Sequence, residues 1–344
     1  MTIGNGKVWI IGQSSELYNV LRTVKKASKS DASILIRGET GTGKELIAAA
    51  IHYDSFRRKE QFVKLNCAAI QDTLLESELF GHEKGSFTGA NHQKKGKLEM
   101  ANGGTLLLDE IGDMTPTIQS KVLRALGERA FERVGGTDSI EVDVRFISAT
   151  NADLEERIEE KEFRKDLYYR LNTITIILPP LRTRKKDILP IAEYYCKLYS
   201  AELRRDITGF TDVAIEAMLD YTWPGNVREL QNSVERACIL ADEKKFLDEK
   251  DLDLYPPKKF NTDEITTEIY DLILDTYGSG DDNVIDIVET NLWERALHRT
   301  KNINLHASTL MGVSPRVGSY RRKKLKLPRS QRARKGSGPK KKGI

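Results

Sequence analysis

The chain has 344 residues, of which 39% are hydrophobic and 31% are charged, a composition typical of a globular protein with two or three domains. No apolar run approaches the roughly 18 residues of a membrane-spanning helix, and the first residues lack the pattern of a secretory signal. The three cysteines and five histidines show no metal-binding spacing, so we expect buried thiols in a reducing compartment and a cytoplasmic protein.

The net charge of +4 is unevenly distributed along the chain. From Arg295 onward there are 16 Lys and Arg and no Asp or Glu, so the rest of the chain is net acidic. An acidic body with a basic tail favours an anionic partner, usually nucleic acid. A tail that only keeps the protein solvated is about equally compatible with the composition.

Short apolar strands alternate with helical stretches over the first half of the chain. Leu17, Val20 and Val24 share one helical face of residues 16–27, after the candidate N-caps Ser14 and Ser15. Strands are predicted at residues 33–37, 62–66, 105–109, 145–150 and 173–178. This alternation predicts an α/β domain over residues 8–180, with a parallel sheet flanked by helices.

Helical patterns dominate after Pro179-Pro180. Helices are predicted at residues 188–203, 212–221 and 226–241, and they form a small all-helical domain over 181–245. An acidic linker over 246–284 then leads to a second helical unit over 285–327, whose first apolar face contains Ile285, Val288, Leu292 and Ala296. A basic tail that we expect to be disordered occupies 328–344.

A phosphate-binding loop is predicted between the strand at 33–37 and the next helix. It has the sequence Gly38-Glu39-Thr40-Gly41-Thr42-Gly43-Lys44. Glycines let successive backbone N–H groups converge on phosphate oxygens, and the helix N-terminus and Lys44 add positive potential. Glu45 stands where a Mg²⁺-binding Ser or Thr is usual.

Two carboxylates follow the apolar strand at 105–109. Asp109 and Glu110 are expected beside the phosphate loop, at the carboxyl edge of the sheet. There Asp109 would hold Mg²⁺ through water, and Glu110 would polarise the water that attacks ATP.

A glycine-bounded loop, Gly85-Ser86-Phe87-Thr88-Gly89-Ala90, lies between these two halves of the nucleotide site. Its glycines permit hinge-like backbone states, and an exposed Phe87 would mark a contact surface. The alternative is a turn whose Phe87 folds back onto the sheet. Together with the nucleotide motifs, the loop closely resembles that of the sigma-54-dependent transcription activators, AAA+ proteins in most of which it is Gly-Ala-Phe-Thr-Gly-Ala. Here Ser86 replaces the alanine, and Glu45 matches a glutamate common in the family.

The resemblance covers about residues 8–245 and 285–327, and it implies roles for further residues. Thr150 and Asn151 match sensor I, Asn66 matches the residue that restrains the catalytic glutamate, and Arg228 matches sensor II. Arg164 and Arg170 match the arginine fingers, which act on the nucleotide of a neighbouring subunit in a hexameric ring. Phe87 and Thr88 would contact sigma-54, and ATP hydrolysis would move the loop to convert closed promoter complexes into open ones.

The C-terminal unit resembles the Fis-like helix-turn-helix of the same family. Gly312 would lie in the turn, and Ser314 and Pro315 would begin the second helix. Residues expected to face double-stranded DNA upstream of promoters are Arg316, Ser319, Tyr320, Arg321 and Lys323.

Two other functions are less well supported. A DNA-binding regulator that uses nucleotide only to assemble would not need Phe87, Thr88 or Glu110, and the helix-turn-helix unit and the Gly85–Ala90 loop argue against an AAA+ unfoldase or chaperone. The nucleotide domain starts almost at Met1, so no N-terminal regulatory domain is expected. Control would then come from expression, from a partner protein acting in trans, or from the acidic linker.

Overall fold

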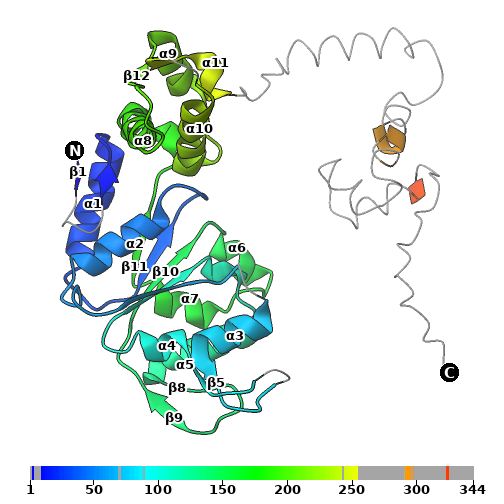
Figure 1. Ribbon diagram of the computed structural model, residues 1–344. Coiled ribbons are helices and arrows are strands. Elements are labelled where there is room, and N and C mark those ends of the chain that lie inside the picture. Colours follow the sequence, from blue (N-terminus) through cyan, green and yellow to red (C-terminus); the bar gives the residue numbers. More distant parts are fainter. Residues whose placement is uncertain are drawn as a thin grey trace, which may run out of the picture. The chain divides into compact units, whose positions relative to one another are not determined.

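The computed structural model describes residues 2–3, 9–68, 71–87, 90–241 and 244–254, and farther along the chain residues 290, 292–295, 297, 323 and 324. The chain divides into two compact units, Met1–Pro257 and Lys258–Ile344 (Figure 1). No helix within the described ranges is both long and apolar enough to cross a bilayer.

A five-stranded parallel sheet forms the centre of the first unit. Its strand order is β11-β3-β10-β7-β4, with β3 at Ile34–Arg37, β4 at Phe62–Asn66, β7 at Thr105–Asp109, β10 at Arg145–Thr150 and β11 at Ile174–Ile177. The chain leaves β3 toward one edge and returns to place β11 on its other side. The carboxyl end of β3 is therefore the switch point at which such sheets bind ligands.

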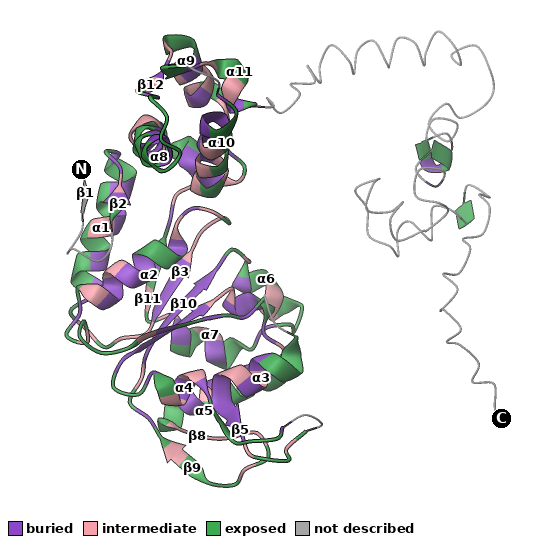
Figure 2. Ribbon diagram, viewed as in Figure 1, coloured by how far each residue is buried: buried purple, intermediate pink, exposed green. Residues whose placement is uncertain are grey.

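Helices cover both faces of this sheet, so the inner strands β3, β7 and β10 are almost entirely buried, whereas the edge strands β4 and β11 keep exposed positions (Figure 2). Leu107 faces α1 (Ser15–Ala27) and α2 (Lys44–Tyr53), whereas Leu106 and Leu108 face α3 (Asp72–Phe80), α5 (Pro116–Glu128) and α7 (Lys165–Leu171). Successive strand residues point to opposite faces, and both faces here meet an apolar helix surface. The predicted α/β fold with a helix-flanked parallel sheet is confirmed.

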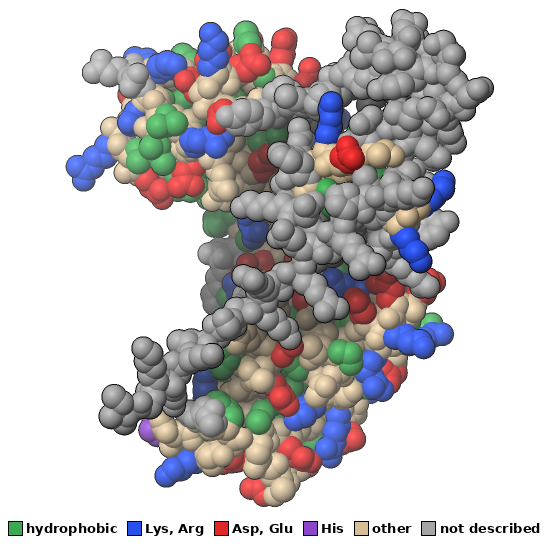
Figure 3. All heavy atoms as spheres, turned by 90° about the vertical axis from the view of Figure 1, so that its right-hand side faces the viewer, with side chains coloured by type: hydrophobic (Ala, Val, Ile, Leu, Met, Phe, Trp, Pro, Cys, Tyr) green, Lys and Arg blue, Asp and Glu red, His purple; other side chains and the backbone are tan. Residues whose placement is uncertain are grey.

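Several short elements surround the sheet. Ser14 caps α1 by accepting from Leu17 N at 3.2 Å. The remaining elements are β1 (Thr2–Ile3), β2 (Ile10–Ile11), β5 (Gly81–His82), β6 (Lys94–Lys95), α4 (Lys97–Met100), η1 (Ile111–Asp113), β8 (Ala130–Glu132), β9 (Ser139–Glu141) and α6 (Leu154–Glu159). Figure 3 shows acidic and basic side chains interspersed over the described part of the face that it presents.

A helical lid follows the sheet domain. Two short turns, η2 (Leu181–Thr183) and η3 (Lys185–Asp187), lead into α8 (Ile188–Glu202), β12 (Gly209–Phe210), α9 (Asp212–Asp220), α10 (Asn226–Leu240), β13 (Phe246–Leu247) and α11 (Glu249–Leu252). Its core contains the fully buried Trp223, whose Nε1 donates to Met218 O at 2.8 Å. Leu247 and Leu252 join this core, so the expected boundary at residue 245 falls inside a packed unit.

In the second unit, helical structure is described for residues 290, 292–295, 297, 323 and 324. Trp293 and Leu297 are buried, four residues apart, whereas Leu292 is 51% exposed. The predicted apolar face is therefore wrong at Leu292. Lys323 is helical and exposed. The other expected DNA-contacting residues, Arg316, Ser319, Tyr320 and Arg321, lie outside the described residues, as do most of the expected linker and the basic tail.

Candidate active site

The phosphate loop lies at the switch point, between β3 and α2. Lys44 opens α2 and is only 6% exposed. Its Nζ donates to Gly38 O at 2.9 Å and lies 3.2 Å from Glu110 Oε1. An anionic phosphate at this helix N-terminus would compete with Glu110 for the lysine.

The acidic pair lies at the end of β7, beside the phosphate loop. Burial, followed by the charge of Glu110, raises the pKa of Asp109 above its usual range. Glu110 adopts the left-handed conformation (φ 52°, ψ 51°), which is uncommon for a residue other than glycine and turns the chain sharply into η1. Asn66 Nδ2 donates to Asp109 Oδ2 at 3.4 Å, so the Asn66 side chain contacts the first carboxylate of the pair.

Asn151 connects Glu110 to the phosphate loop. Its backbone N donates to Glu110 Oε2 at 3.0 Å, and its Nδ2 donates to Thr40 Oγ1 at 3.0 Å. The neighbouring Thr150 is buried, and its carbonyl accepts from Gly38 N at 3.2 Å. Thr150 thus anchors the loop to β10, whereas Asn151 is the side chain that faces the site.

The lid holds the phosphate loop through the start of α10. Gly41 O accepts from Val227 N at 3.0 Å and from Arg228 N at 3.3 Å. Gly41 has φ +80°, and a Cβ there would lie 2.2 Å from Gly225 O, so only glycine fits this approach. Arg228 is exposed and lines a cavity of about 450 Å³ together with Thr40.

Glu39 and Glu45 both form ion pairs next to the loop. Glu45 Oε1 lies 2.8 Å from Lys64 Nζ on β4. Glu39 Oε2 accepts from Arg182 Nη1 at 2.8 Å and from Asn226 Nδ2 at 3.1 Å, which joins the loop to the lid. The hydrogen bond from Arg182 lowers the pKa of Glu39 from 4.5 to about 2.

The lowered pKa of Glu39 predicts a pH-dependent contribution to stability. Because the folded-state pKa lies below the unfolded value, the contribution is present above pH 4.5 and is lost as pH falls toward 2. Both side chains are more than 40% exposed, so screening limits it to about 0.5–1 kcal/mol. Urea unfolding should show this deficit for Glu39→Gln at pH 7 and a smaller one below pH 4. Glu216→Gln, at an exposed position on α9, is the control. An equal Glu39→Gln deficit at every pH would contradict the assignment.

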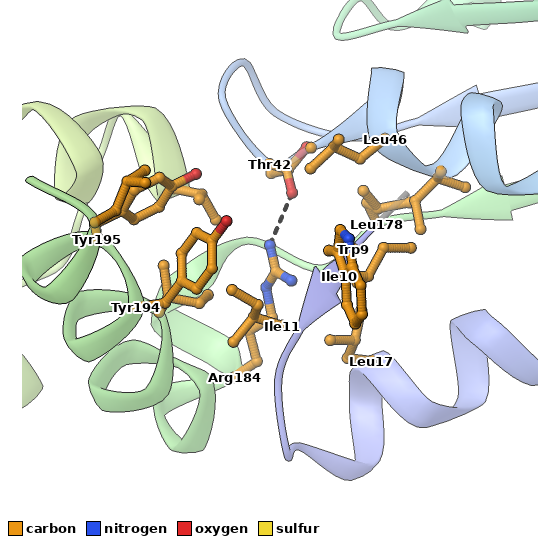
Figure 4. A pocket seen from close by; sticks show the side chains of 15 residues that line it. Trp9, Ile10, Ile11, Leu17, Thr42, Leu46, Leu178, Arg184, Tyr194 and Tyr195 are labelled. Carbon is orange, nitrogen blue, oxygen red and sulfur yellow. Dashed lines mark hydrogen bonds between the residues drawn. The ribbon is translucent and has the colours of Figure 1, made fainter. Parts of the chain in front are cut away.

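An apolar pocket that the sequence analysis missed adjoins the loop at Thr42 and Gly43 (Figure 4). It has a volume of about 230 Å³. Its side chains come from the segment before α1, from α2 and from α8, and include Trp9, Ile10, Leu46, Tyr194 and Tyr195. Apolar walls beside a phosphate loop suit the flat ring of a nucleotide base. The apolar run Val8-Trp9-Ile10-Ile11 ahead of α1 is the local signal that could have indicated the pocket.

The two candidate finger arginines lie in different places. Arg164 is the N-cap residue of α7, and its side chain pairs with Asp166 and donates to Ser120 Oγ at 3.1 Å. Arg170 is exposed and lines a cavity of about 270 Å³ with Asp31 and Thr173, which precede β3 and β11. Arg170 is thus at the amino edge of the sheet, opposite the phosphate loop of its own chain.

The glycine-bounded loop lies between β5 and β6. Gly85 N donates to Ala90 O at 2.8 Å, and the Phe87 ring is 40% exposed with its centroid 5.0 Å from that of His82. The ring thus partly folds back while keeping an exposed face. Thr88 and Gly89 lie outside the described residues. At the loop base, Arg133 pairs with Glu83 at 2.9 Å.

Ser86 packs against the hairpin formed by β8 and β9. A Cβ at Gly135, which has φ +78°, would lie 2.5 Å from the Ser86 Cβ. The Ser86 Oγ is buried and has no hydrogen-bond partner among the described residues. We therefore expect Ser86→Ala to stabilise the fold by about 1 kcal/mol in urea unfolding, because it removes an unpaired buried hydroxyl. The matched variant is Ser77→Ala, whose hydroxyl pairs with His82 Nδ1 at 2.7 Å and whose loss should destabilise. A destabilising Ser86→Ala would show that the hydroxyl has a partner.

Two family models match the chain. One is described as the sigma-54 interaction domain and matches residues 10–177, and the other is described as an AAA+ ATPase lid domain and matches residues 182–266. Among solved structures, NtrX from Brucella abortus in complex with ATP is 30% identical with a TM-score of 0.67, and the match covers 93% of this chain and 70% of NtrX.

The curated proteins that match the chain in sequence are also regulatory proteins. The Nif-specific regulatory protein of Herbaspirillum seropedicae is 52% identical over 67% of this chain and 43% of its own length. The transcriptional regulatory protein ZraR of Klebsiella oxytoca is 49% identical over 71% and 55%, and the regulatory protein AtoC of Escherichia coli K12 is 52% identical over 67% and 50%. The chain thus spans about half the length of these curated relatives.

Proposed function

Because the chain belongs to the sigma-54-dependent transcription activators, a family whose central domain is an AAA+ P-loop NTPase, we propose that it hydrolyses ATP to remodel closed complexes of sigma-54 RNA polymerase into open complexes. The observation that carries the proposal is the convergence of Lys44, Glu110 and Asn151 on one phosphate loop. The ATP and ADP bound to the related NtrX support adenine nucleotides as the ligand.

Each residue of the site has a part in this chemistry. Lys44 would exchange its contact with Glu110 for a phosphate oxygen, which frees Glu110 to polarise the attacking water. Asn151 would sense the bound phosphates through the contact of its side chain with Thr40, and its backbone N–H would hold Glu110 in place. The apolar pocket at Trp9 and Tyr194 would take the adenine ring.

Mg²⁺ fits the donor set. Among the described residues no group of three His, Cys, Asp or Glu could hold a metal alone, so phosphate oxygens and water would complete the ligands around Asp109. The ion would neutralise charge on the phosphates. The raised pKa of Asp109 reflects burial beside Glu110, and a nearby cation would favour its ionised form.

A ring is part of the proposal because, in the described contacts, neither candidate finger touches the phosphate loop of its own chain. Arg170 lies at the opposite edge of the sheet from the phosphate loop, so as a finger it would act on a neighbour's nucleotide. Arg164 is held by Asp166 in the same chain and is the other candidate. We propose a homohexamer in which one of these arginines completes each site.

Further parts of the proposal concern partners and layout. The loop 85–90, with Phe87 at its tip, would contact sigma-54. Helix-turn-helix residues over 285–327 would bind upstream double-stranded DNA, and the basic tail 328–344 would add salt-sensitive attraction. The domain layout, a cytoplasmic location and regulation by a partner acting in trans also remain proposals.

The test is open-complex formation by purified sigma-54 holoenzyme on a supercoiled promoter with an upstream binding site. We expect single-stranded DNA reactivity at the start site with ATP and none with a non-hydrolysable analogue. Open complexes that form equally well with the analogue would support the assembly-only regulator instead. Hydrolysis of ATP without any open complex would point to another remodelling target.

A further inference from the structure

A buried arginine faces the apolar pocket beside the phosphate loop. Arg184 lies between η2 and η3, and its side chain is only 4% exposed. Its Nη2 donates to Thr42 O at 2.9 Å, the interaction drawn in Figure 4. Its Nη1 lies 4.0 Å from Asp187 Oδ2. The guanidinium therefore joins the pocket to the phosphate loop.

The Nε donor of this arginine is buried. No group in the described part of the chain accepts a hydrogen bond from it. Arginine stays charged, and buried polar groups in proteins are almost always paired, so an orphan donor in a pocket wall marks a place where a partner is expected. Burial also lowers the pKa of Arg184, which is the effect expected of a guanidinium that lacks full compensation.

The turn that carries Arg184 also fixes the opposite wall of the pocket. Asp187 is fully buried, and its carboxylate accepts from Gln13 N at 2.5 Å, from Ser14 N at 2.7 Å and from Ser14 Oγ at 2.7 Å. These bonds hold the segment that begins at Trp9 and supplies Ile10 and Ile11 to the pocket. Residues Arg184 and Asp187 thus connect both walls of the pocket to the loop.

We propose that Arg184 is a positioning residue that recognises the nucleoside half of the bound nucleotide, with Nε donating to an acceptor atom of the purine ring or the ribose. The inference rests on the proposed function in that the ligand is an adenine nucleotide. Adenine offers ring nitrogens as acceptors, and the apolar walls take its faces. Because Nη2 of the same group holds Thr42 O, a filled pocket stabilises the phosphate loop in its observed form.

The test removes single acceptor atoms from the ligand and, separately, removes Nε from residue 184. Equilibrium binding of ADP and of its 1-deaza, 3-deaza, 7-deaza and 2′-deoxy analogues is measured for wild type, Arg184→Lys and Arg184→Met. In wild type, one analogue should bind about tenfold more weakly than ADP, because it lacks the atom that accepts the hydrogen bond from the charged Arg184 side chain. In both variants that penalty should vanish, because neither side chain has a nitrogen at the position of Nε.

Lys185→Met is the matched control, because Lys185 is a basic residue of the same turn that is exposed and does not line the pocket. It should keep the wild-type ratios for every analogue. ATP hydrolysis gives a second readout: Arg184→Lys should raise KM for ATP about tenfold with little change in kcat, whereas general damage to the fold would lower both kcat and nucleotide affinity.

If the affinity of each analogue relative to ADP is the same in wild type and in the Arg184 variants, the proposed role of Arg184 is wrong. If Arg184→Met does not fold, because it leaves Asp187 buried without its cation, Arg184→Lys keeps the charge and still lacks Nε. The binding assay needs no hydrolysis, so a wild type that binds ADP without hydrolysing ATP would contradict the proposed function and leave this inference standing. A wild type that binds no adenine nucleotide would overturn both.

Discussion

Glu110→Gln is expected to lower the rate of ATP hydrolysis at least about a hundredfold while nucleotide affinity stays within about threefold of wild type. An amide cannot polarise or deprotonate the attacking water as a carboxylate does. Affinity should persist because Lys44, which pairs with Glu110 at 3.2 Å, would lose only a competitor of the phosphates. Phosphate release and fluorescent-ADP binding measure the two quantities separately.

Asp113→Asn is the control for this variant. Asp113 is a carboxylate of the same turn, and it pairs with Arg157 at 3.1 Å outside the phosphate loop. Its loss should change hydrolysis less than about threefold, in line with a partly exposed ion pair. Hydrolysis retained in Glu110→Gln would remove Glu110 from the catalytic role, and equal losses in both variants would indicate damage to η1 instead.

Phe87→Ala is expected to reduce open-complex formation at least about thirtyfold with ATP hydrolysis within about twofold of wild type. The ring is 40% exposed and packs edge-on against His82, so its removal costs the fold little. Aromatic anchors at the centre of an interface typically contribute 2 kcal/mol or more, and about 1.4 kcal/mol corresponds to tenfold. Single-stranded DNA reactivity at the promoter and phosphate release provide the two readouts.

Phe56→Ala is the matched control, since Phe56 is 83% exposed and follows α2 rather than the loop. It should leave both readouts unchanged. Thr88→Ala, next to Phe87, should reproduce the loss of open complexes with hydrolysis largely intact. Normal transcription by both loop variants would exclude the loop as the sigma-54 contact.

The sheet could be predicted from the sequence because its signals are local. Each strand is a short apolar run between helical or glycine-containing stretches, and the strands at 62–66, 105–109 and 145–150 have the predicted bounds. The run Leu106-Leu107-Leu108 is uninterrupted, as expected of a strand buried on both faces, whereas the edge strand at 62–66 alternates buried and exposed residues. The phosphate loop was equally visible, because its glycines and Lys44 are contiguous.

The apolar pocket could not be predicted, because its walls come from segments far apart in the chain. Trp9, Leu46 and Tyr194 have no common pattern until the lid and the segment before α1 meet the phosphate loop. Arg184 and Asp187 gave no signal either, since charged residues in a turn are usually exposed. Their burial depends on contacts with Thr42 and Ser14, more than 140 residues away.

By itself, the sequence determined the β-α alternation, the glycine-lysine loop, the acidic pair and the Gly85–Ala90 loop, because each depends on neighbouring residues and on a backbone geometry that they impose. Only the tertiary structure decided that Glu110 pairs with Lys44, that Asn151 links Glu110 to Thr40, and that Ser86 lies against Gly135. These pairings arise when parallel strands bring their carboxyl ends to one edge and distant turns pack together. Burial and electrostatic compensation, which no short stretch of sequence contains, then select the partners.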